Sequence, residues 1–147
     1  MSNSKKVTRE QLFGLINGKL TIRINRYLGA RLRDAGIGIT VEQWTVLACL
    51  WQKDKLSQQI LSQTTFRDKT TMTRLINNLE KQGLVVRVPD TIDRRVNLVY
   101  LTQKGMDLEQ KASAVIEKVA KHTLSILTEE ELNMGIILLR KVYDHLA

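Results

Sequence analysis

The chain has 147 residues, of which 43% are hydrophobic and 26% are charged, as is ordinary for one soluble domain with a hydrophobic core. It contains no apolar run near the ~18 residues that a membrane-spanning segment needs, and its first residues, MSNSKKVTRE, lack the apolar stretch of a signal peptide. One cysteine cannot form an internal disulfide, so we expect a cytoplasmic protein without a membrane partner.

The formal net charge of +8 is concentrated in two zones of the sequence. Residues 1–33 carry eight Lys or Arg against one acid, and residues 67–104 carry eight against four. Residues 34–66 and 105–147 are slightly acidic. A basic surface favours an anionic partner such as nucleic acid, although surplus Lys and Arg can also be plain solvated surface.

The first predicted element is a long amphipathic helix, because apolar residues recur at every fourth position. These residues are Leu12, Ile16, Leu20, Ile24, Leu28 and Leu32. Two glycines within residues 34–38 end the pattern. No repeat, low-complexity segment or linker divides the chain, so we expect one compact unit.

Two helices are then predicted from their capping residues. Thr40 and Gln43 have capping-box spacing and start a helix that ends before Lys53. Ser57 can cap a short helix, SQQILSQTTF, over residues 57–66.

The next predicted helix has the clearest boundaries in the sequence. Asp68 can cap it, and Gly83 follows it as a residue able to adopt the left-handed backbone that ends helices. Its apolar residues lie on one face and are Met72, Leu75, Ile76 and Leu79.

From Leu84 the hydrophobic period changes to two, which is typical of β-strands. Alternating apolar residues in 84–89 and 96–100 flank the turn-rich sequence PDTIDR, so we expect a β-hairpin. Pro89, the only proline, can end the first strand because it needs no ladder hydrogen bond there.

Two more helices complete the chain. Thr102 can cap a long helix whose apolar residues extend to Ile126, and Thr128 with Glu131 forms another capping box before the last helix. The helices at the two ends of the chain are apolar on one face. We expect them to pack either on each other or on a second copy of the chain.

A short helix, a tight connection, a well-capped helix and a hairpin form the winged helix-turn-helix arrangement, in which the second helix of the pair enters the DNA major groove. We therefore predict a mainly α fold with a small β-hairpin wing and a terminal-helix region. Several side chains of the second helix are of types that contact phosphates and base edges. They are Lys69, Thr70, Thr71, Thr73, Arg74 and Asn77. The plain alternative is that the threonines are caps and solvent-facing residues.

Other chemistry finds little support in the sequence. Cys49 lies in the apolar stretch VLACLW and is expected to be an inert packing residue. His122 and His145 lack the spacing of a zinc site, and there is no nucleotide-binding loop or acid–base constellation. We expect no metal, no cofactor and no enzyme. A winged-helix module that binds protein instead of DNA is a second hypothesis, which the basic residues of the helix and the hairpin disfavour.

The sequence resembles the MarR family of bacterial transcriptional regulators. The resemblance rests on residues 68–105, DKTTMTRLINNLEKQGLVVRVPDTIDRRVNLVYLTQKG, which match the family's recognition helix, its NLEKxGLV exit, its DxxDRR wing and its LTxKG helix start. ITVEQWTVLACLW looks like the family's second helix, and the long first and last helices fit its dimerisation region.

The resemblance implies a homodimer that binds a palindromic double-stranded DNA operator, in most cases as a repressor that a small aromatic or phenolic effector releases. It implies a single unit over residues 1–147. Within it, residues 40–104 are the DNA-binding module, and residues 1–35 and 105–147 are dimerisation helices. Some members sense peroxide through a cysteine near the start of the first helix, where this sequence has none. The effector pocket is not placed by the sequence.

Carried over residue by residue, the helix over 69–77 would read the major groove, and Arg94 or Arg95 would enter the minor groove. The narrow, electronegative minor groove of A·T-rich DNA suits a guanidinium group. Asp93 would hold the wing tip rigid as an i,i+2 partner of Arg95, with Arg94 as the inserting residue. The alternative is that Asp93 and Arg95 form an incidental surface ion pair of under ~1 kcal/mol.

Overall fold

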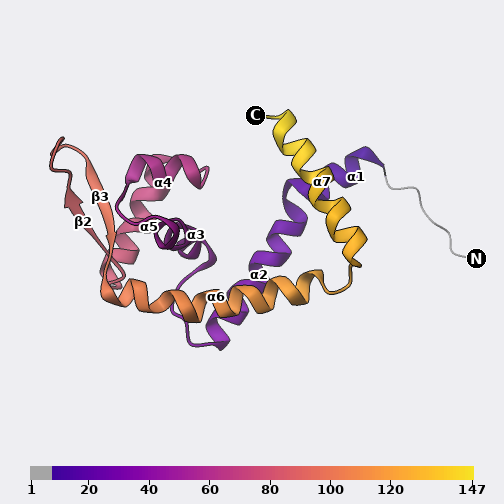
Figure 1. Ribbon diagram of the computed structural model, residues 1–147, viewed down its shortest axis with the longest axis horizontal. Helices are drawn as coiled ribbons and strands as arrows, with labels where there is room; N and C mark the ends of the chain where they lie inside the picture. The colour runs from indigo at the N-terminus through magenta and orange to yellow at the C-terminus, as the bar shows by residue number, and fades with distance from the viewer. Residues whose placement is uncertain (1–7) are drawn as a thin grey trace, which may run out of the picture.

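The computed structural model describes residues 8–147, and residues 1–7 of the predicted dimerisation segment lie outside this range. The described chain has the mainly helical winged helix-turn-helix fold that the sequence predicts (Figure 1). Its elements in chain order are α1 (Arg9–Gly14), the π-helical turn η1 (Leu15–Lys19), α2 (Leu20–Asp34), α3 (Val41–Gln52), β1 (Leu56–Ser57), α4 (Gln58–Thr64), α5 (Lys69–Lys81), β2 (Val85–Pro89), β3 (Asn97–Leu101), α6 (Gln103–Leu124) and α7 (Glu129–His145).

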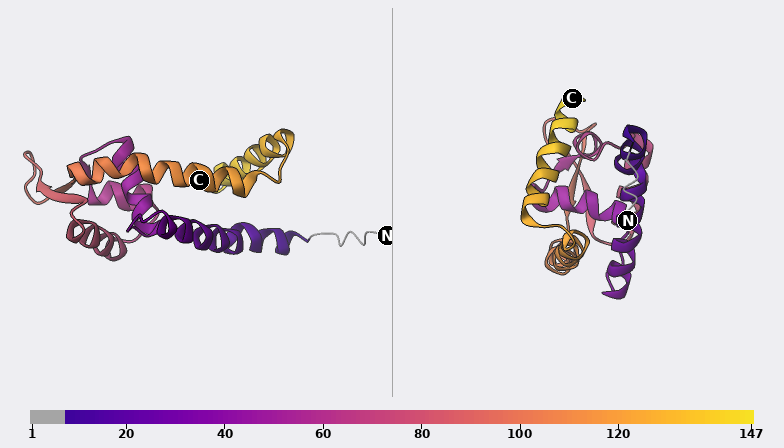
Figure 2. Two further views of the ribbon diagram at one scale, coloured as in Figure 1. Left: turned by 90° about the horizontal axis from the view of Figure 1, so that it is seen from below. Right: turned by 90° about the vertical axis from the view of Figure 1, so that its right-hand side faces the viewer.

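The molecule is elongated along α6 (Figures 1 and 2). The helices α3, α4 and α5 gather with the sheet at one end of α6, and α2 crosses its middle. The helices α1 and α7 lie at the other end; they overlap in Figure 1 but are apart in Figure 2. The winged unit and the terminal helices are therefore separated along the long axis.

The hydrophobic core lies almost entirely in the winged unit, which consists of α3, α4, α5 and the sheet with the parts of α2 and α6 that pack against them. The buried face of α5 packs against α3 and the sheet, and α2 and α6 add Leu28, Leu32, Ala112 and Val119. The four apolar residues predicted for this face of α5 are all fully buried: Met72, Leu75, Ile76 and Leu79. By contrast, α1, η1 and α7 contain no buried residue.

The predicted helix starts in this unit are confirmed by cap geometry, but α4 ends at Thr64 and not at the predicted Phe66. Thr40 and Gln43 form a reciprocal capping box at the start of α3. Ser57 caps α4 and Asp68 caps α5, and each accepts a hydrogen bond from a backbone N–H one turn on. Gly83 follows α5 with a φ of 72°, the left-handed conformation that glycine adopts without strain.

The prediction of one continuous first helix is wrong, because the structure divides it into α1, η1 and α2. The helical path is broken at Asn17 and Gly18, where Gly18 has a φ of 148° and a ψ of −42°. Glycine tolerates this backbone because it lacks a Cβ atom. The four-residue spacing of apolar side chains continues across the break from Leu12 to Leu32 and so does not reveal it.

The hairpin is confirmed by the antiparallel pairing of β2 and β3. Val85 is fully buried, whereas Val86 is exposed. Val85 and Val86 are both apolar, so the sequence alone does not tell which of the two faces the core. Pro89 ends β2, as predicted, opposite Asn97.

The sheet contains a third strand that the sequence did not reveal. The order is β1-β3-β2, with Leu56 opposite Val99 and Val85 opposite Leu101. Asp54, which lies just before β1, also contacts β3: its Oδ1 accepts a hydrogen bond of 2.9 Å from the backbone N–H of Leu101. A two-residue strand is too short to show any hydrophobic period.

The C-terminal helices are confirmed at their starts and corrected at one end. Thr102 caps α6, and Thr128 forms the predicted capping box of α7 with Glu131. However, α6 ends at Leu124, and Ile126 is exposed in the connection instead of on the buried side of the helix. None of the helices described in residues 8–147 is long and apolar enough to cross a membrane.

The terminal helices do not pack on each other within the chain. Within the described residues, α7 makes no more than marginal contact with any other element. Of the two arrangements considered for the terminal helices, packing within one chain is therefore wrong.

The start of α6 is held against the wing by an unusually close approach at Gly105. A Cβ atom at this position would overlap the carbonyl oxygen of Leu84. The carbonyl of Gly105 also accepts a hydrogen bond of 2.9 Å from Nε1 of Trp51. The contact thus fixes α6 relative to both α3 and the start of β2.

We expect Gly105→Ala to lower the free energy of unfolding by about 1–3 kcal/mol, because backbone must move to admit the methyl group. Urea denaturation of both proteins measures the change. Gly135→Ala is the matched control: it is also helical, has open space around it, and should be neutral or stabilising by up to ~1 kcal/mol. Equal urea midpoints for Gly105→Ala and the parent protein would contradict the steric argument.

Candidate nucleic-acid interface

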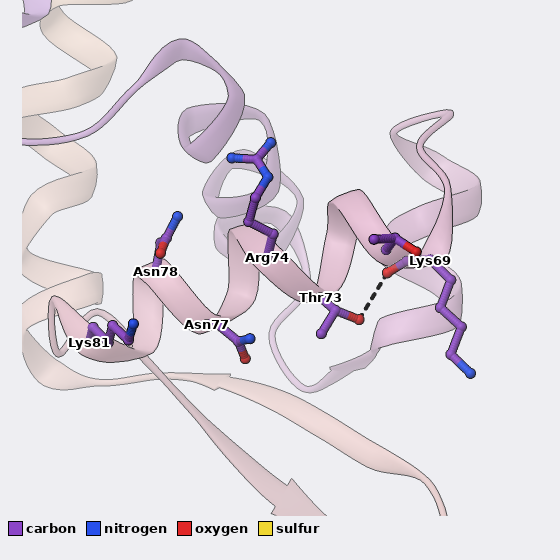
Figure 3. A pocket seen from close by; sticks show the side chains of 7 residues that line it. Lys69, Thr73, Arg74, Asn77, Asn78 and Lys81 are labelled. Atoms are coloured by element: carbon purple, nitrogen blue, oxygen red, sulfur yellow. Dashed lines mark hydrogen bonds between the residues drawn. The ribbon is translucent and has the colours of Figure 1, made fainter.

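The face of α5 opposite its buried side forms an open, polar groove (Figure 3). It brings together five of the six side chains predicted on this helix, Thr71 being the exception. The lining residues are Lys69, Thr70, Thr73, Arg74, Asn77, Asn78 and Lys81. Asn78 and Lys81 were missed because the prediction stopped after two turns of the helix, although their spacing from Arg74 and Asn77 places them on the same face.

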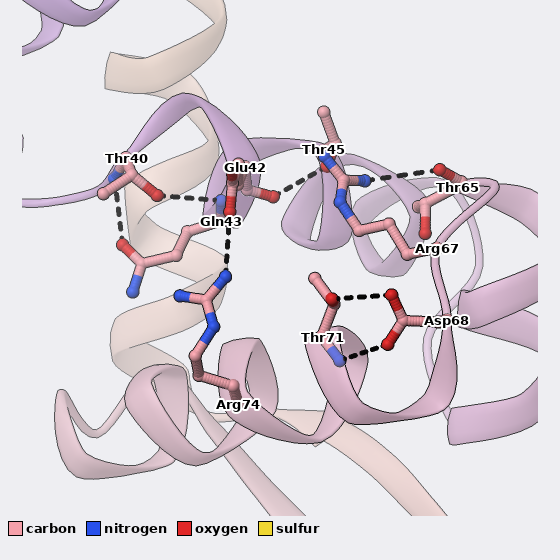
Figure 4. Close-up of polar contacts among 9 residues, drawn as sticks. All are labelled: Thr40, Glu42, Gln43, Thr45, Thr65, Arg67, Asp68, Thr71 and Arg74. Atoms are coloured by element: carbon pink, nitrogen blue, oxygen red, sulfur yellow. Dashed lines mark hydrogen bonds and ion pairs between the residues drawn. The ribbon is translucent and has the colours of Figure 1, made fainter.

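Thr71 serves the start of the helix. Its backbone N–H and its hydroxyl donate hydrogen bonds of 2.7 Å and 2.9 Å to the two carboxylate oxygens of Asp68 (Figure 4). These two bonds hold the pKa of Asp68 below its usual range. The alternative considered from the sequence, that these threonines serve to cap the helix, therefore applies to Thr71.

The hydroxyl of Thr73 is also occupied. It donates to the backbone carbonyl of Lys69 over 2.8 Å and accepts a hydrogen bond of 2.5 Å from Nε2 of Gln58. The second bond ties α5 to α4, the other helix of the helix-turn-helix pair. What Thr73 offers to the groove is its methyl group.

Arg74 reaches from α5 toward the first turn of α3 (Figure 4). Its guanidinium lies 3.3 Å from the carboxylate of Glu42, and both side chains are more than half exposed. An exposed pair of this kind contributes under ~1 kcal/mol, so the guanidinium can exchange Glu42 for a phosphate or a base at little cost.

The wing tip is a tight, hydrogen-bonded loop. The backbone N–H of Asp90 donates to the carbonyl of Val96 over 2.8 Å, and that of Val96 donates to the carbonyl of Asp93 over 2.9 Å. The second bond encloses Arg94 and Arg95 as the central residues of a β-turn. Both arginines therefore lie in the loop that joins β2 to β3.

Asp93 contacts Arg95 in the i,i+2 geometry considered from the sequence. Its Oδ1 accepts hydrogen bonds of 3.1 Å from both the backbone N–H and Nε of Arg95. The guanidinium of Arg95 lowers the pKa of the Asp93 carboxyl. The Arg95 side chain is nevertheless 92% exposed. Arg94 is exposed and makes no side-chain hydrogen bond or ion pair with residues 8–147.

A second groove lies between the wing, α4 and the start of α5. It is lined by Ser57, Gln58, Gln59, Ser62, Lys69, Arg95, Val96 and Asn97. Lys69 and Arg95 place cations from the helix and from the wing on the same groove. The polar residues of α4 were missed by the sequence prediction, and the run SQQ at the helix start was their only signal.

Cys49 and the two tryptophans belong to the packing of the fold. Burial raises the pKa of the Cys49 thiol, an effect that the charge of Arg67 partly opposes. Such a thiol is a poor nucleophile at neutral pH. Trp44 and Trp51 pack against the core.

In residues 8–147, no cluster of three or more His, Cys, Asp or Glu could hold a metal ion.

Comparison with known proteins gives the geometry a context. A family model described as "MarR family" matches residues 39–96. The HTH-type transcriptional regulator YdgJ of Bacillus subtilis is 27% identical over 123 residues, which cover 84% of this chain and 74% of that protein. The chain spans only about half the length of two further curated relatives, 47% and 52%.

Solved structures agree over a longer stretch. A crystal structure of S. aureus MepR in complex with DNA has a TM-score of 0.81 at 26% identity, covering 95% of this chain and 99% of that one. The apo form of wild-type MarR from E. coli has a TM-score of 0.75 at 26% identity, covering 94% and 98%.

The lowered pKa of Asp68 predicts a pH dependence of stability. A group whose pKa is depressed in the folded protein contributes stability above its unfolded pKa and loses it as the pH falls through the folded value. Asp68→Asn keeps a capping side chain that does not titrate. We expect the parent protein to unfold at a higher temperature than Asp68→Asn at neutral pH, with the gap narrowing as the pH falls below the ordinary Asp pKa of about 3.9. A gap that is independent of pH would contradict this account.

Proposed function

Because the chain belongs to the MarR family of DNA-binding transcriptional regulators, we propose that it acts as a homodimeric repressor of a palindromic operator, released by a small aromatic or phenolic effector. Neither the sign of regulation nor the effector class follows from family membership, and both are part of the proposal. The observation that carries the DNA-binding part is the shared groove of the recognition helix α5 and the wing, with Lys69 and Arg95 on its walls.

In the proposed complex, α5 lies in the major groove and the wing tip in the adjacent minor groove. Lys69, Thr70, Arg74 and Asn77 are the proposed contacts from α5, with the methyl group of Thr73 beside them. Asn78 and Lys81 extend the same face of α5 toward the neighbouring sugar-phosphate backbone of the DNA. Cations and amides on one helix face suit both phosphate and base-edge contacts.

At the wing, we propose that Arg94 enters the minor groove and that Arg95 is braced by Asp93. The exposed side chain of Arg94 and the Asp93–Arg95 contact support this division. A braced loop keeps the inserting guanidinium in place before DNA arrives, which reduces the entropy lost on binding.

The homodimer is supported by apolar surface that has no partner within the described chain. Large exposed apolar surfaces mark association sites in soluble proteins. The residues on α7 and its approach are Ile126, Leu127, Met134, Ile136, Ile137, Leu138, Leu139, Val142, Tyr143 and Leu146. Those on the N-terminal helices are Leu12, Phe13, Leu15, Ile16, Leu20 and Ile22.

The two surfaces fit the proposed division into dimerisation segments, 1–35 and 105–147, and a DNA-binding module, 40–104. The division is functional and not one of folding units, since Leu32 and Ala112 of the dimerisation segments are fully buried in the shared core. A palindromic operator would place the two copies of α5 about 34 Å apart, one helical turn of DNA.

For the effector, we propose the groove between α2 and α6, within the dimerisation segments. Tyr27 stacks on His122 with ring centroids 5.3 Å apart, and the guanidinium of Arg31 lies 5.2 Å from the centre of the Tyr27 ring. Aromatic rings beside a cation suit an aromatic anion. Such a ligand would release DNA by favouring a dimer in which the two copies of α5 are wrongly spaced.

To test the wing assignment, the operator is first selected from fragments of the native genome with the purified protein. Arg94→Ala and Arg95→Ala should each bind it more weakly, with the slope of log affinity against log salt reduced by about one per lost phosphate contact. Mobility-shift titration at several salt concentrations gives both quantities. Lys121→Ala, in the last turn of α6, removes the same charge away from the wing and should change neither. Unchanged affinity and slope for both arginine variants would refute the wing assignment.

The dimer is tested by placing a charge on its proposed interface. We expect Leu139→Glu to halve the mass measured by size exclusion with light scattering, because a buried carboxylate without a partner is costly. Operator affinity should fall with it, since two half-sites would no longer bind as one unit. Asn133→Glu introduces the same charge at a polar position of α7 and should remain dimeric. A monomeric parent protein would exclude the proposal outright.

A further inference from the structure

The recognition helix is joined to the wing by a polar network that centres on Arg87 of β2. One terminal nitrogen of its guanidinium donates to Oε2 of Glu80 over 2.5 Å, and the other donates to Oδ1 of Asn77 over 2.6 Å. Glu80 and Asn77 lie one turn apart on α5, and Figure 3 shows Asn77 on the side of the helix that faces the strands.

Arg87 is held from its backbone as well as from its side chain. The strand β2 is at the edge of the sheet, with Arg87 opposite Val99 of β3. Its backbone N–H donates to Oε1 of Glu80 over 3.3 Å, so one carboxylate holds both ends of the residue. Only 20% of the Arg87 side chain is exposed, which makes it a poor ligand for phosphate despite its charge.

The chemistry of arginine determines which atom of Asn77 it holds. A guanidinium has only donors, so the amide atom that faces it must be the carbonyl oxygen. The Nδ2 group of Asn77 then points the other way, into the groove of α5 that Asn77 lines. Asn77 therefore presents hydrogen-bond donors to a ligand in this groove and keeps its acceptor within the protein.

We propose that Arg87 is a positioning residue that decides which base Asn77 can read. The inference rests on the proposed function. An asparagine that recognises adenine uses its oxygen and its nitrogen together, on N6 and N7 of the base. Arg87 occupies one lone pair of the oxygen and orients the amide, which disfavours that bidentate contact, so Asn77 favours the acceptors of guanine, O6 and N7, or of thymine, O4.

The test compares base preference at the operator position that Asn77 contacts. This position is identified as the one whose preference disappears in Asn77→Ala. In the parent protein it should favour guanine or thymine over adenine by about five- to a hundredfold. The double variant Arg87→Met with Glu80→Gln frees the amide without leaving a lone carboxylate, and adenine should become competitive at that position. In an Asn77→Ala background the same double variant should change base preference no further.

Two controls separate positioning from a loss of structure or of charge. Glu80→Gln alone retains the contact between Arg87 and Asn77 and should retain the preference of the parent protein. The salt dependence of binding should be the same for the parent protein and the double variant, because Arg87 is not proposed to contact phosphate. Thermal unfolding establishes that each variant is folded.

If the double variant does not fold, Asn77→Asp carries the test. The aspartate can give one oxygen to Arg87 and turn the other, an acceptor, to the groove, so preference should move toward cytosine, whose N4 amino group is a donor. An adenine preference in the parent protein would overturn the inference, and so would an Asn77→Ala variant whose base preference is unchanged at every position. It is also overturned if the double variant keeps the base preference of the parent protein, or if Asn77→Asp does not move the preference toward cytosine. A parent protein that binds all sequences equally would instead refute the proposed function.

Discussion

The position of every α5 side chain that is proposed to face DNA depends on one apolar contact, the burial of one face of α5 against α3 and the sheet. Met72, Leu75, Ile76 and Leu79 are fully buried there. Removing such a face from water contributes roughly 1.5–3 kcal/mol per large side chain, more than any polar contact at the surface of this helix. The burial fixes the rotation of α5 about its axis, and that rotation determines which residues can meet a ligand.

Upon this apolar contact the protein adds polar contacts that orient the exposed side chains. Thr71 is bound by Asp68, Thr73 by Gln58, Arg74 by Glu42, and Asn77 by Arg87. Each partner comes from a different neighbouring segment: the helix start, α4, α3 and the wing. Side chains fixed in this way lose less conformational entropy when a ligand binds, so the contacts act on specificity and affinity together.

The sequence predicted the features that depend on local physics. Caps at Thr40, Asp68 and Thr128 are fixed by residues within one turn, so spacing alone identified them. The break at Gly18 was missed because a continuous apolar stripe carries no information about φ, and β1 because two residues cannot show a period. The partners Glu42 and Arg87 lie 32 and 10 residues from the side chains they hold. No sequence pattern connects such pairs, and only the packing of the helices and the wing brings them together.

Within residues 8–147, α7 makes no more than marginal contact with other elements, and this has a consequence for how the protomers associate in the proposed dimer. A helix of 17 residues with so little packing is marginally stable in water. In the proposed dimer, ordering α7 and burying its apolar face occur in the same event, so the measured dissociation constant includes the free energy of helix formation. The helix content of the protein then depends on its concentration. Dilution far below that constant would melt α7 first, while the winged unit, which has its own core, stays folded.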